Sequence, residues 1–253
     1  MTHVPASKFL NIAHRGASAV APENTLSAFR AAIEAGATAI EMDLRVTRDG
    51  HVVIMHDRHV NRTTNGAGLV RQLTLAQLKE LDAGSSFDHR FAGETVPTLQ
   101  DVFAAIPAPL VLHVKESDVG IEERVITLAR QHHALDRIVV SSRLHRVLVK
   151  AKVLQPDIQT TFVSYCWSWR PWMRWVAFRA KQLSVDRIAL KGTLVTPAML
   201  RYFKGQGLLV RAWGANCDEA LAARLIQMGV DGLSFDHPAR LWEIWADDSD
   251  AAG

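Results

Sequence analysis

Two carboxylates and a histidine–aspartate pair lie close together in the segment Ala39 to Asp57, which reads AIEMDLRVTRDGHVVIMHD. Alternate side chains of a strand share a face, so Glu41 and Asp43 point to the same side. Two adjacent carboxylates repel each other unless a cation lies between them, and hard divalent cations prefer oxygen ligands of this kind. The segment therefore indicates a metal site, although two solvated acids on an exposed strand would show the same pattern.

The turn at Asp49-Gly50 indicates how a second pair of reactive groups reaches these acids. Parallel neighbours need a connection of a dozen or more residues, so the segments on either side of this turn must form an antiparallel hairpin. The returning segment, which begins at Val52, ends in His56 and Asp57. We expect the hairpin to bring His56 back toward the two carboxylates.

Groups suited to phosphate chemistry follow three other strand-like segments. They are a histidine and an arginine, a histidine and a lysine on one strand face, and a tryptophan: His14 and Arg15, His113 and Lys115, and Trp213. Cationic side chains bind phosphate, and paired imidazoles donate and accept protons near neutral pH. Each group alone is a weak signal, but the complete set at one site would indicate phosphoryl chemistry.

Strand-like and helix-like segments alternate along nearly the whole chain. The expected strands, the hairpin aside, are 9–13, 38–46, 110–115, 137–142, 159–164, 186–190, 208–213 and 232–235. The expected helices are 25–35, 72–82, 99–106, 121–133, 145–154, 197–204 and 218–228. This alternation predicts an α/β fold of the (β/α)8 type, a TIM barrel with a small hairpin-containing insertion after the second strand. Catalytic groups of such barrels lie at the C-terminal ends of the strands, where the candidates above are found.

Length and composition fit a single domain over residues 1–253. We expect an insertion at about 47–96 and a loose polar tail at about 247–253. The hydrophobic fraction of 48% is enough for a sizeable core. A net charge of +3 without dense runs of Lys and Arg suits a small anionic substrate and argues against nucleic acid as a partner.

The number of cysteines and the length of the apolar runs indicate the cellular compartment of the protein. The two cysteines, Cys166 and Cys217, give no disulfide framework. The N-terminal segment has no apolar signal core, and no apolar run is long enough to span a membrane. We therefore expect a cytoplasmic protein, and the sequence indicates no obligate protein partner.

Seven motifs, taken in order, resemble the glycerophosphodiester phosphodiesterase family. They are HRGASAVAPENT, IEMDLRVTRDGHVVIMHD, NRTTNGAG, LDAG, VPTLQDV, VRAWGAN and MGVDGLSFDHP. The resemblance runs from about Ile12 to Leu241. It implies a TIM barrel with a small segment inserted after the second strand. It also implies hydrolysis of glycerophosphodiesters to an alcohol and sn-glycerol 3-phosphate with a divalent metal cation, Mg²⁺, Ca²⁺ or Mn²⁺.

The same resemblance implies roles for individual residues. His14 and His56 would be the acid–base pair, and Glu41 and Asp43 would be metal ligands. Arg15 and Lys115 would bind the phosphate. The pocket would be supported by Glu23, Asn24 and Trp213. The chain departs from the family at His113, where the family usually has a glutamate. We expect His113 to be the third metal ligand, which would admit softer ions because nitrogen ligands favour them.

Two other functions stay open at this point. A lysophospholipase D would act on diesters that carry an acyl chain. The segment YCWSWRPWMRWVAFRA, from Tyr165 to Ala180, supports this alternative. Its tryptophans, from Trp167 to Trp175, either lie buried in a helix packed on the barrel or form a lip that contacts a membrane surface. A degenerate barrel that binds phosphodiesters without hydrolysing them is the second alternative, and His113 is its main support.

Overall fold

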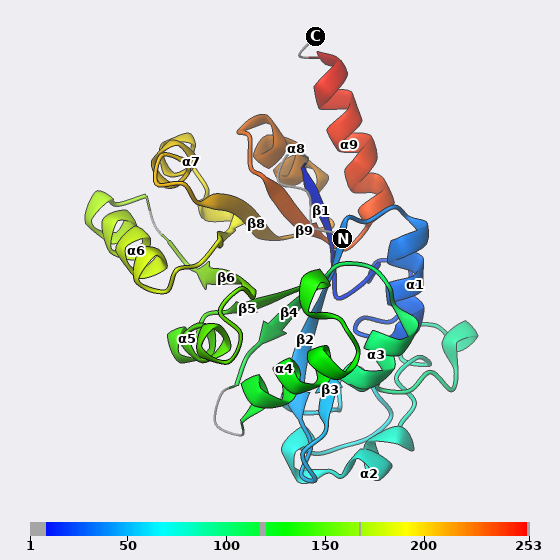
Figure 1. The fold of residues 1–253 in the computed structure, drawn as a ribbon. Helices are drawn as coiled ribbons and strands as arrows, with labels where there is room; N and C mark the ends of the chain where they lie inside the picture. Colours follow the sequence, from blue (N-terminus) through cyan, green and yellow to red (C-terminus); the bar gives the residue numbers. More distant parts are fainter. Residues whose placement is uncertain (1–8, 117–119, 167, 252–253) are drawn as a thin grey trace.

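A computed structural model of the chain describes residues 9–116, 120–166 and 168–251. Eight parallel strands form a closed barrel, in which β1 pairs with both β9 and β2 (Figure 1). The barrel strands are β1 (Leu10–His14), β2 (Ala39–Val46), β4 (Leu110–Val114), β5 (Ile138–Ser142), β6 (Gln159–Ser164), β7 (Arg187–Lys191), β8 (Leu209–Asn216) and β9 (Gly232–Phe235). The predicted (β/α)8 barrel is confirmed.

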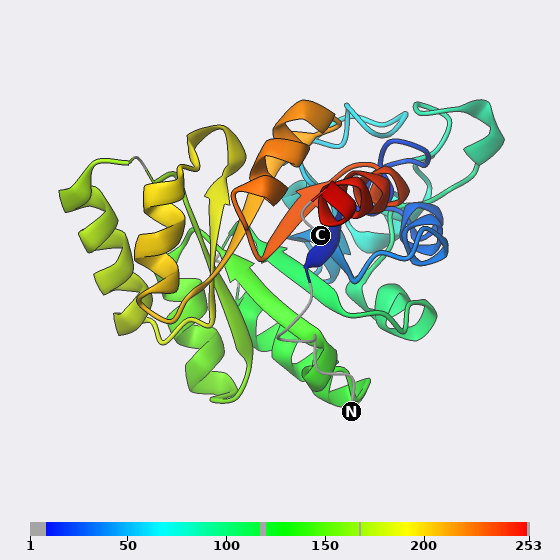
Figure 2. The same cartoon turned by 90° about the horizontal axis from the view of Figure 1, so that it is seen from above.

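Helices surround the barrel, as the two perpendicular views show (Figures 1 and 2). They are α1 (Leu26–Glu34), α3 (Leu99–Ala105), α4 (Ile121–Gln131), α5 (His145–Leu154), α6 (Arg170–Gln182), α7 (Pro197–Lys204), α8 (Glu219–Gln227) and α9 (Pro238–Ala251). Helix α1 begins where the Thr25 side chain accepts a hydrogen bond from the backbone N–H of Ala28, 3.3 Å away. Its buried face, which includes Phe29, packs in the core around the barrel.

Strand β2 shows how the sequence divides its side chains between two environments. Ile40, Met42 and Leu44 belong to the core between strands and helices. Glu41 and Asp43 alternate with them and are also buried, so they face the inside of the barrel. The strand is therefore buried on both faces, and the hypothesis of two solvated acids on an exposed strand is wrong.

The insertion after β2 carries the predicted hairpin. Strand β3 (Val52–Ile54) pairs with β2 in antiparallel fashion. The rest of the insertion has its own small apolar cluster, Val53, Met55, Val60, Val70, Leu78, Ala83 and Val96. Its helix α2 (Leu75–Lys79) is shorter than the expected helix at 72–82, because Thr74 and Gln77 form a capping box that starts the helix at Leu75.

The C-terminal segment differs from the sequence-based expectation. Helix α9 continues to Ala251, so residues 247–251 of the expected loose tail are helical. Trp242 and Trp245 of this helix contact the ring of Phe9, which anchors α9 beside the start of β1. Among the described residues, every helix is too short or too polar to cross a bilayer.

Candidate functional site

The predicted chemical groups meet in one pocket of about 140 Å³ at the C-terminal ends of the strands. Its lining consists of His14, Arg15, Glu41, Asp43, His56, His113, Lys115, Arg143, Val163, Tyr165, Arg211, Trp213 and Ser234. All the predicted catalytic, metal-binding and substrate-binding residues line this pocket except Glu23 and Asn24. The hairpin does bring His56 to the two carboxylates, since β3 returns alongside β2.

Strand register places three potential metal ligands side by side. Asp43 of β2 is the register partner of His113 on β4. The Nδ1 atom of His113 lies 3.3 Å from Oε1 of Glu41 and 3.5 Å from Oδ1 of Asp43. One ligand atom from each of the three residues lies within 4.8 Å of the others, and the described residues contain no second group of this kind. Two carboxylates and an imidazole form a donor set that suits a divalent cation.

Both carboxylates are anionic in spite of their burial. Burial by itself raises the pKa of Asp43, but Lys115, His113 and Arg15 together lower it well below its ordinary value. The Nζ atom of Lys115 lies 2.9 Å from Oδ1 of Asp43. Burial and the neighbouring Asp43 raise the pKa of Glu41, whereas the hydrogen bond with His113 lowers it, and the net direction is downward.

Asn24 and Glu23 do not line the pocket but bind two residues that do, Asp43 and Arg15. The side chain of Asn24 donates to Oδ2 of Asp43 over 3.2 Å and accepts from the backbone N–H of the same residue over 3.2 Å. Glu23 Oε1 accepts a hydrogen bond of 2.9 Å from Nη1 of Arg15. These two residues therefore hold Asp43 and Arg15 in place, and their predicted role in binding substrate stays a prediction.

Each histidine of the predicted acid–base pair has its own aspartate. The Nδ1 atom of His14 lies 2.6 Å from Oδ1 of Asp236, and Nδ1 of His56 lies 2.6 Å from Oδ1 of Asp57. Such a contact fixes the ring and leaves Nε2 as the free nitrogen. Asp236 is not among the predicted site residues, although it follows β9 directly and β9 pairs with β1.

The two imidazoles differ in their electrostatic surroundings. Burial lowers the pKa of His14, but the hydrogen bond with Asp236 and the charge of Glu41 raise it above the ordinary value. Burial also lowers the pKa of His56, and the positive charges of Lys115 and Arg15 keep it below the ordinary value. His14 is therefore more readily protonated than His56 at the same pH.

Arg62 of the insertion connects Asp57, the partner of His56, with Glu23. Its Nε donates to Oδ2 of Asp57 over 2.6 Å, and its two Nη atoms donate to the carboxylate of Glu23 over 2.8 and 2.7 Å. Because Glu23 also binds Arg15, one chain of ion pairs connects His56 with Arg15, the predicted phosphate-binding residue. Arg62 is not among the predicted site residues, because its partners Asp57 and Glu23 come from separate loops.

The pocket also contains a buried arginine that the sequence did not single out. Arg211, two residues before Trp213 on β8, is buried and donates to the hydroxyls of Ser234 and Ser141 over 2.7 and 3.2 Å. Burial lowers its pKa to about 10, so it stays cationic at neutral pH. On the wall, Trp213 contacts Tyr165 edge to face, with ring centroids 5.0 Å apart. Alternation along β8 could have indicated Arg211.

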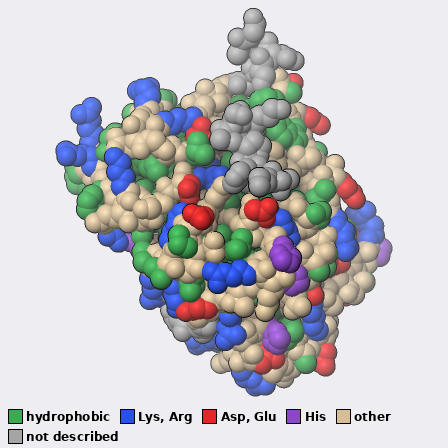
Figure 3. All heavy atoms as spheres, viewed as in Figure 1, with side chains coloured by type: hydrophobic (Ala, Val, Ile, Leu, Met, Phe, Trp, Pro, Cys, Tyr) green, Lys and Arg blue, Asp and Glu red, His purple; other side chains and the backbone are tan. Residues whose placement is uncertain are grey.

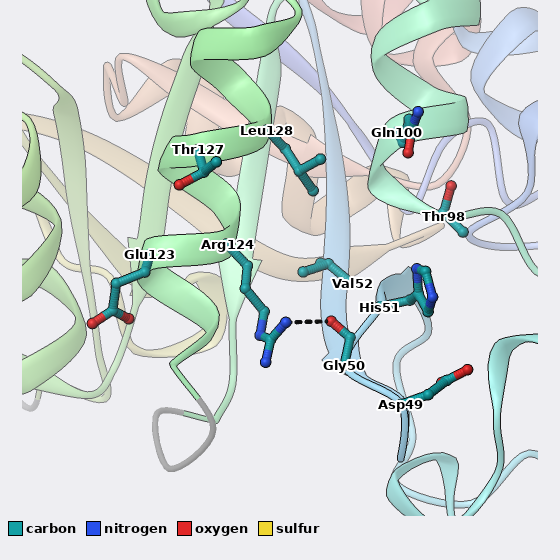
Figure 4. Close-up of a pocket in the computed structure, with 10 residues that line it drawn as sticks. All are labelled: Asp49, Gly50, His51, Val52, Thr98, Gln100, Glu123, Arg124, Thr127 and Leu128. Carbon is teal, nitrogen blue, oxygen red and sulfur yellow. Dashed lines mark hydrogen bonds between the residues drawn. The ribbon is translucent and has the colours of Figure 1, made fainter.

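A second hollow of about 380 Å³ lies outside the barrel mouth, between the hairpin turn and α4 (Figure 4). Its acids do not converge, since Asp49 and Glu123 point away from each other. Glu123 is paired with Lys150, and Arg124 donates to the backbone carbonyl of Gly50 over 2.8 Å. The larger hollow thus lacks the convergent groups that make the smaller pocket the candidate functional site.

Comparisons with known proteins agree with this geometry. Residues 14–240 match the model of the glycerophosphoryl diester phosphodiesterase family. A glycerophosphodiester phosphodiesterase from Caldanaerobacter subterraneus subsp. tengcongensis is 37% identical over 92% of this chain and 96% of its own length. Another from Bacillus subtilis is 31% identical over 91% of this chain and 84% of its own length. A solved structure of an Oleispira antarctica phosphodiesterase, in complex with the product sn-glycerol-3-phosphate, is 32% identical, covers 92% of this chain and 95% of its own, and has a TM-score of 0.84.

Proposed function

This chain belongs to the glycerophosphoryl diester phosphodiesterase family, and we propose that it hydrolyses glycerophosphodiesters to an alcohol and sn-glycerol 3-phosphate with the help of a divalent cation. The observation that carries the proposal is the single pocket in which two anionic carboxylates and two aspartate-bound histidines converge with Arg15 and Lys115. The Oleispira relative supports the choice of product, because its structure holds sn-glycerol-3-phosphate.

Glu41, Asp43 and His113 would hold the cation. Their ligand atoms are close enough together, and both carboxylates are ionised, so the donor set fits a divalent ion. When bound, such an ion would neutralise charge on the phosphate and acidify a hydroxyl near it. Asn24 contributes by fixing the orientation of Asp43 from both its donor and its acceptor side.

Arg15 and Lys115 would bind the phosphate of the substrate. A guanidinium offers a planar fork to phosphate oxygens, and an ammonium offers a compact charge. Both lie within ion-pair distance of Asp43, with Arg15 Nε 3.4 Å and Lys115 Nζ 2.9 Å from its oxygens. The side chain of Trp213 would support the glycerol or alcohol portion, and its Nε1–H is buried without a hydrogen-bond partner among the described residues.

The histidines would move protons at the two oxygens that change bonds. One accepts the proton of the attacking oxygen as its bond to phosphorus forms. The other donates a proton to the alcohol oxygen as that bond to phosphorus breaks. The higher pKa of His14 suits the donor, and the lower pKa of His56 suits the acceptor. Asp236 and Asp57 keep the rings oriented for these transfers.

The test is release of sn-glycerol 3-phosphate from glycerophosphocholine, glycerophosphoethanolamine and glycerophosphoglycerol by the purified protein. We expect release that EDTA abolishes and that added Mg²⁺, Ca²⁺ or Mn²⁺ restores. No release from any of these diesters with any of the three metals would overturn the proposal and favour a barrel that only binds them.

A lysophospholipase D is the second candidate, and one observation favours it. Aromatic rings run from the pocket to the surface, from Trp213 to Tyr165 and then to Trp172, whose Nε1 donates to the backbone carbonyl of Tyr165 over 3.3 Å. Such a path could accommodate an acyl chain on the glycerol portion. Release of choline from lysophosphatidylcholine would distinguish this activity.

The expected cytoplasmic location stays a prediction.

A further inference from the structure

Helix α6 carries large aromatic side chains on its solvent-exposed face. Met173, Val176, Ala177 and Ala180 form its buried face. Trp169, Trp172, Trp175 and Phe178 are 67%, 36%, 43% and 57% exposed. Of the two alternatives for this segment, a helix with its tryptophans buried is therefore wrong, and Trp167 lies outside the described residues. Figures 1 and 2 place α6 at the outer edge of the molecule.

The same part of the chain is strongly basic. Residues 137–185 contain nine Lys and Arg and one Asp, whereas the whole chain has a net charge of only +3. Helix α6 has four of these cations and no acidic residue. In Figure 3, Lys and Arg side chains lie beside hydrophobic ones along the edge that α6 occupies. Exposed aromatic rings interspersed with arginines are typical of helices that lie at a membrane interface.

A basic cleft separates α6 from α7. It has a volume of about 880 Å³ and is lined by Ser168, Arg170, Pro171, Met173, Arg174, Ala198, Arg201 and Tyr202. Arg170, Arg174 and Arg201 are exposed, and the structure shows no ion pair between any of them and a carboxylate of the described residues. Three guanidinium groups in one cleft, without a carboxylate partner in the described part of the chain, are suited to phosphate oxygens.

The exposed face of α6 adjoins the mouth of the catalytic pocket. Tyr165, which lines that pocket, accepts through its backbone carbonyl a hydrogen bond from Trp172. Trp172 in turn stacks on Trp175, with ring centroids 4.9 Å apart. A molecule held against these rings would therefore lie next to the reacting groups.

We propose that α6 and the α6–α7 cleft dock the protein on an anionic phospholipid bilayer. Trp169 and Phe178 enter the interface, and Arg170, Arg174 and Arg201 bind lipid phosphates. The charge selects this occupant, because a second copy of the chain would bring the same basic surface into contact with itself. Docking on the bilayer depends only on the exposed rings and cations of α6 and the α6–α7 cleft, and not on the proposed function. Its consequence, that lysophospholipids in the bilayer reach the pocket over Tyr165, rests on the proposed function.

The test is cosedimentation of the full chain with vesicles of phosphatidylcholine alone and of phosphatidylcholine with about one third phosphatidylglycerol. We expect binding to the anionic vesicles that falls as NaCl rises, since salt screens the attraction. Each basic side chain near an anionic surface adds about fivefold in affinity, so Arg170→Gln with Arg174→Gln should weaken binding at least about tenfold. Trp169→Ser with Phe178→Ser should also reduce binding to the anionic vesicles. It should abolish the blue shift of tryptophan fluorescence that we expect when the native protein binds them.

Matched controls are Phe87→Ser and Arg30→Gln, which remove an exposed aromatic and an exposed cation elsewhere and should bind vesicles as the native protein does. All variants should keep the native melting temperature and hydrolyse glycerophosphocholine normally. Equal binding to both vesicle types, or native binding by both surface variants, would overturn the proposal. So would a dimer in light scattering that Trp169→Ser with Phe178→Ser dissociates. Vesicle binding is measured without turnover, so an inactive protein that still docks would contradict only the proposed function.

Discussion

Asp43 and His113 are register partners on the neighbouring strands β2 and β4, and their Oδ1 and Nδ1 atoms lie 3.5 Å apart. Register is a property of the backbone ladder, so it places the imidazole beside the carboxylates whichever rotamer a bound ion would select. A histidine here brings a nitrogen donor and no negative charge. The proposed metal site therefore differs in kind from an all-carboxylate site.

The first prediction follows from that donor set. His113→Glu should tighten binding of Mg²⁺ and Ca²⁺ and reduce the preference for Mn²⁺ or Co²⁺, because it replaces nitrogen with anionic oxygen. Isothermal titration of each metal into native protein and variant measures both affinities. His113→Ala is the control, and its affinity for Mn²⁺ should fall. Native affinity in His113→Ala for every metal would show that His113 is no ligand.

The second prediction separates the roles of the two histidines. His14→Ala and His56→Ala should each lower kcat/KM for glycerophosphocholine about a hundredfold or more. On a glycerophospho-p-nitrophenyl ester, His14→Ala should recover most of its activity, because p-nitrophenolate leaves as the anion and needs no proton donor. His56→Ala should stay defective on both substrates. The reverse pattern would exchange the donor and acceptor roles, and unaltered melting temperatures would exclude a folding defect.

Much of the fold was readable from the sequence, and the reason is periodicity. The expected bounds of 145–154 and 159–164 coincide with α5 and β6, and the short turn at Asp49-Gly50 correctly separated β3 from the barrel strands. Strand ends also placed the candidate site, because all parallel strands of a barrel end at the same rim.

The rest of the site depends on contacts that no local pattern specifies. Asp236 and Arg62 reach their partners across 222 and 39 residues of chain. The sequence left open whether the tryptophans of α6 are buried, for a different reason. Tryptophan is apolar enough to suggest a core position, yet the smaller Val176, Ala177 and Ala180 fill the face against the barrel. Which apolar face packs inward depends on the shape of its neighbour.

The third prediction concerns stability of the insertion. A Cβ atom built on Gly84 would lie 1.8 Å from the backbone oxygen of Phe91, so Gly84→Ala should force the loop apart. We expect a loss of about 2 kcal/mol or more in the free energy of unfolding. Gly93→Ala is the control, because a Cβ there meets no atom within 4 Å and only its positive φ is strained. Urea denaturation measures both, and equal losses would contradict the packing argument.

The last prediction concerns Arg62 and acid. Burial raises the pKa of Asp57, but hydrogen bonds from Arg62 and His56 lower it to about 2. The ordinary value in an unfolded chain is about 3.9. A depressed pKa means that the unfolded state binds more protons between these two values. The contribution of Asp57 to stability is therefore complete above about pH 4 and is lost as the pH falls toward 2.

Arg62→Gln removes the principal partner of Asp57, so its pKa should rise toward the ordinary value. The variant should be less stable than the native protein at pH 5 to 7, and the difference should shrink between about pH 4 and pH 2. Urea unfolding followed by tryptophan fluorescence at pH 6, 4 and 3 measures this convergence. Because the same arginine positions His56 and, through Glu23, Arg15, kcat/KM should fall about tenfold or more. Arg62→Lys should restore only part of either property, since an ammonium cannot fork between two carboxylates. A constant stability difference across this pH range would show that Arg62 stabilises the insertion by packing and not by its charge.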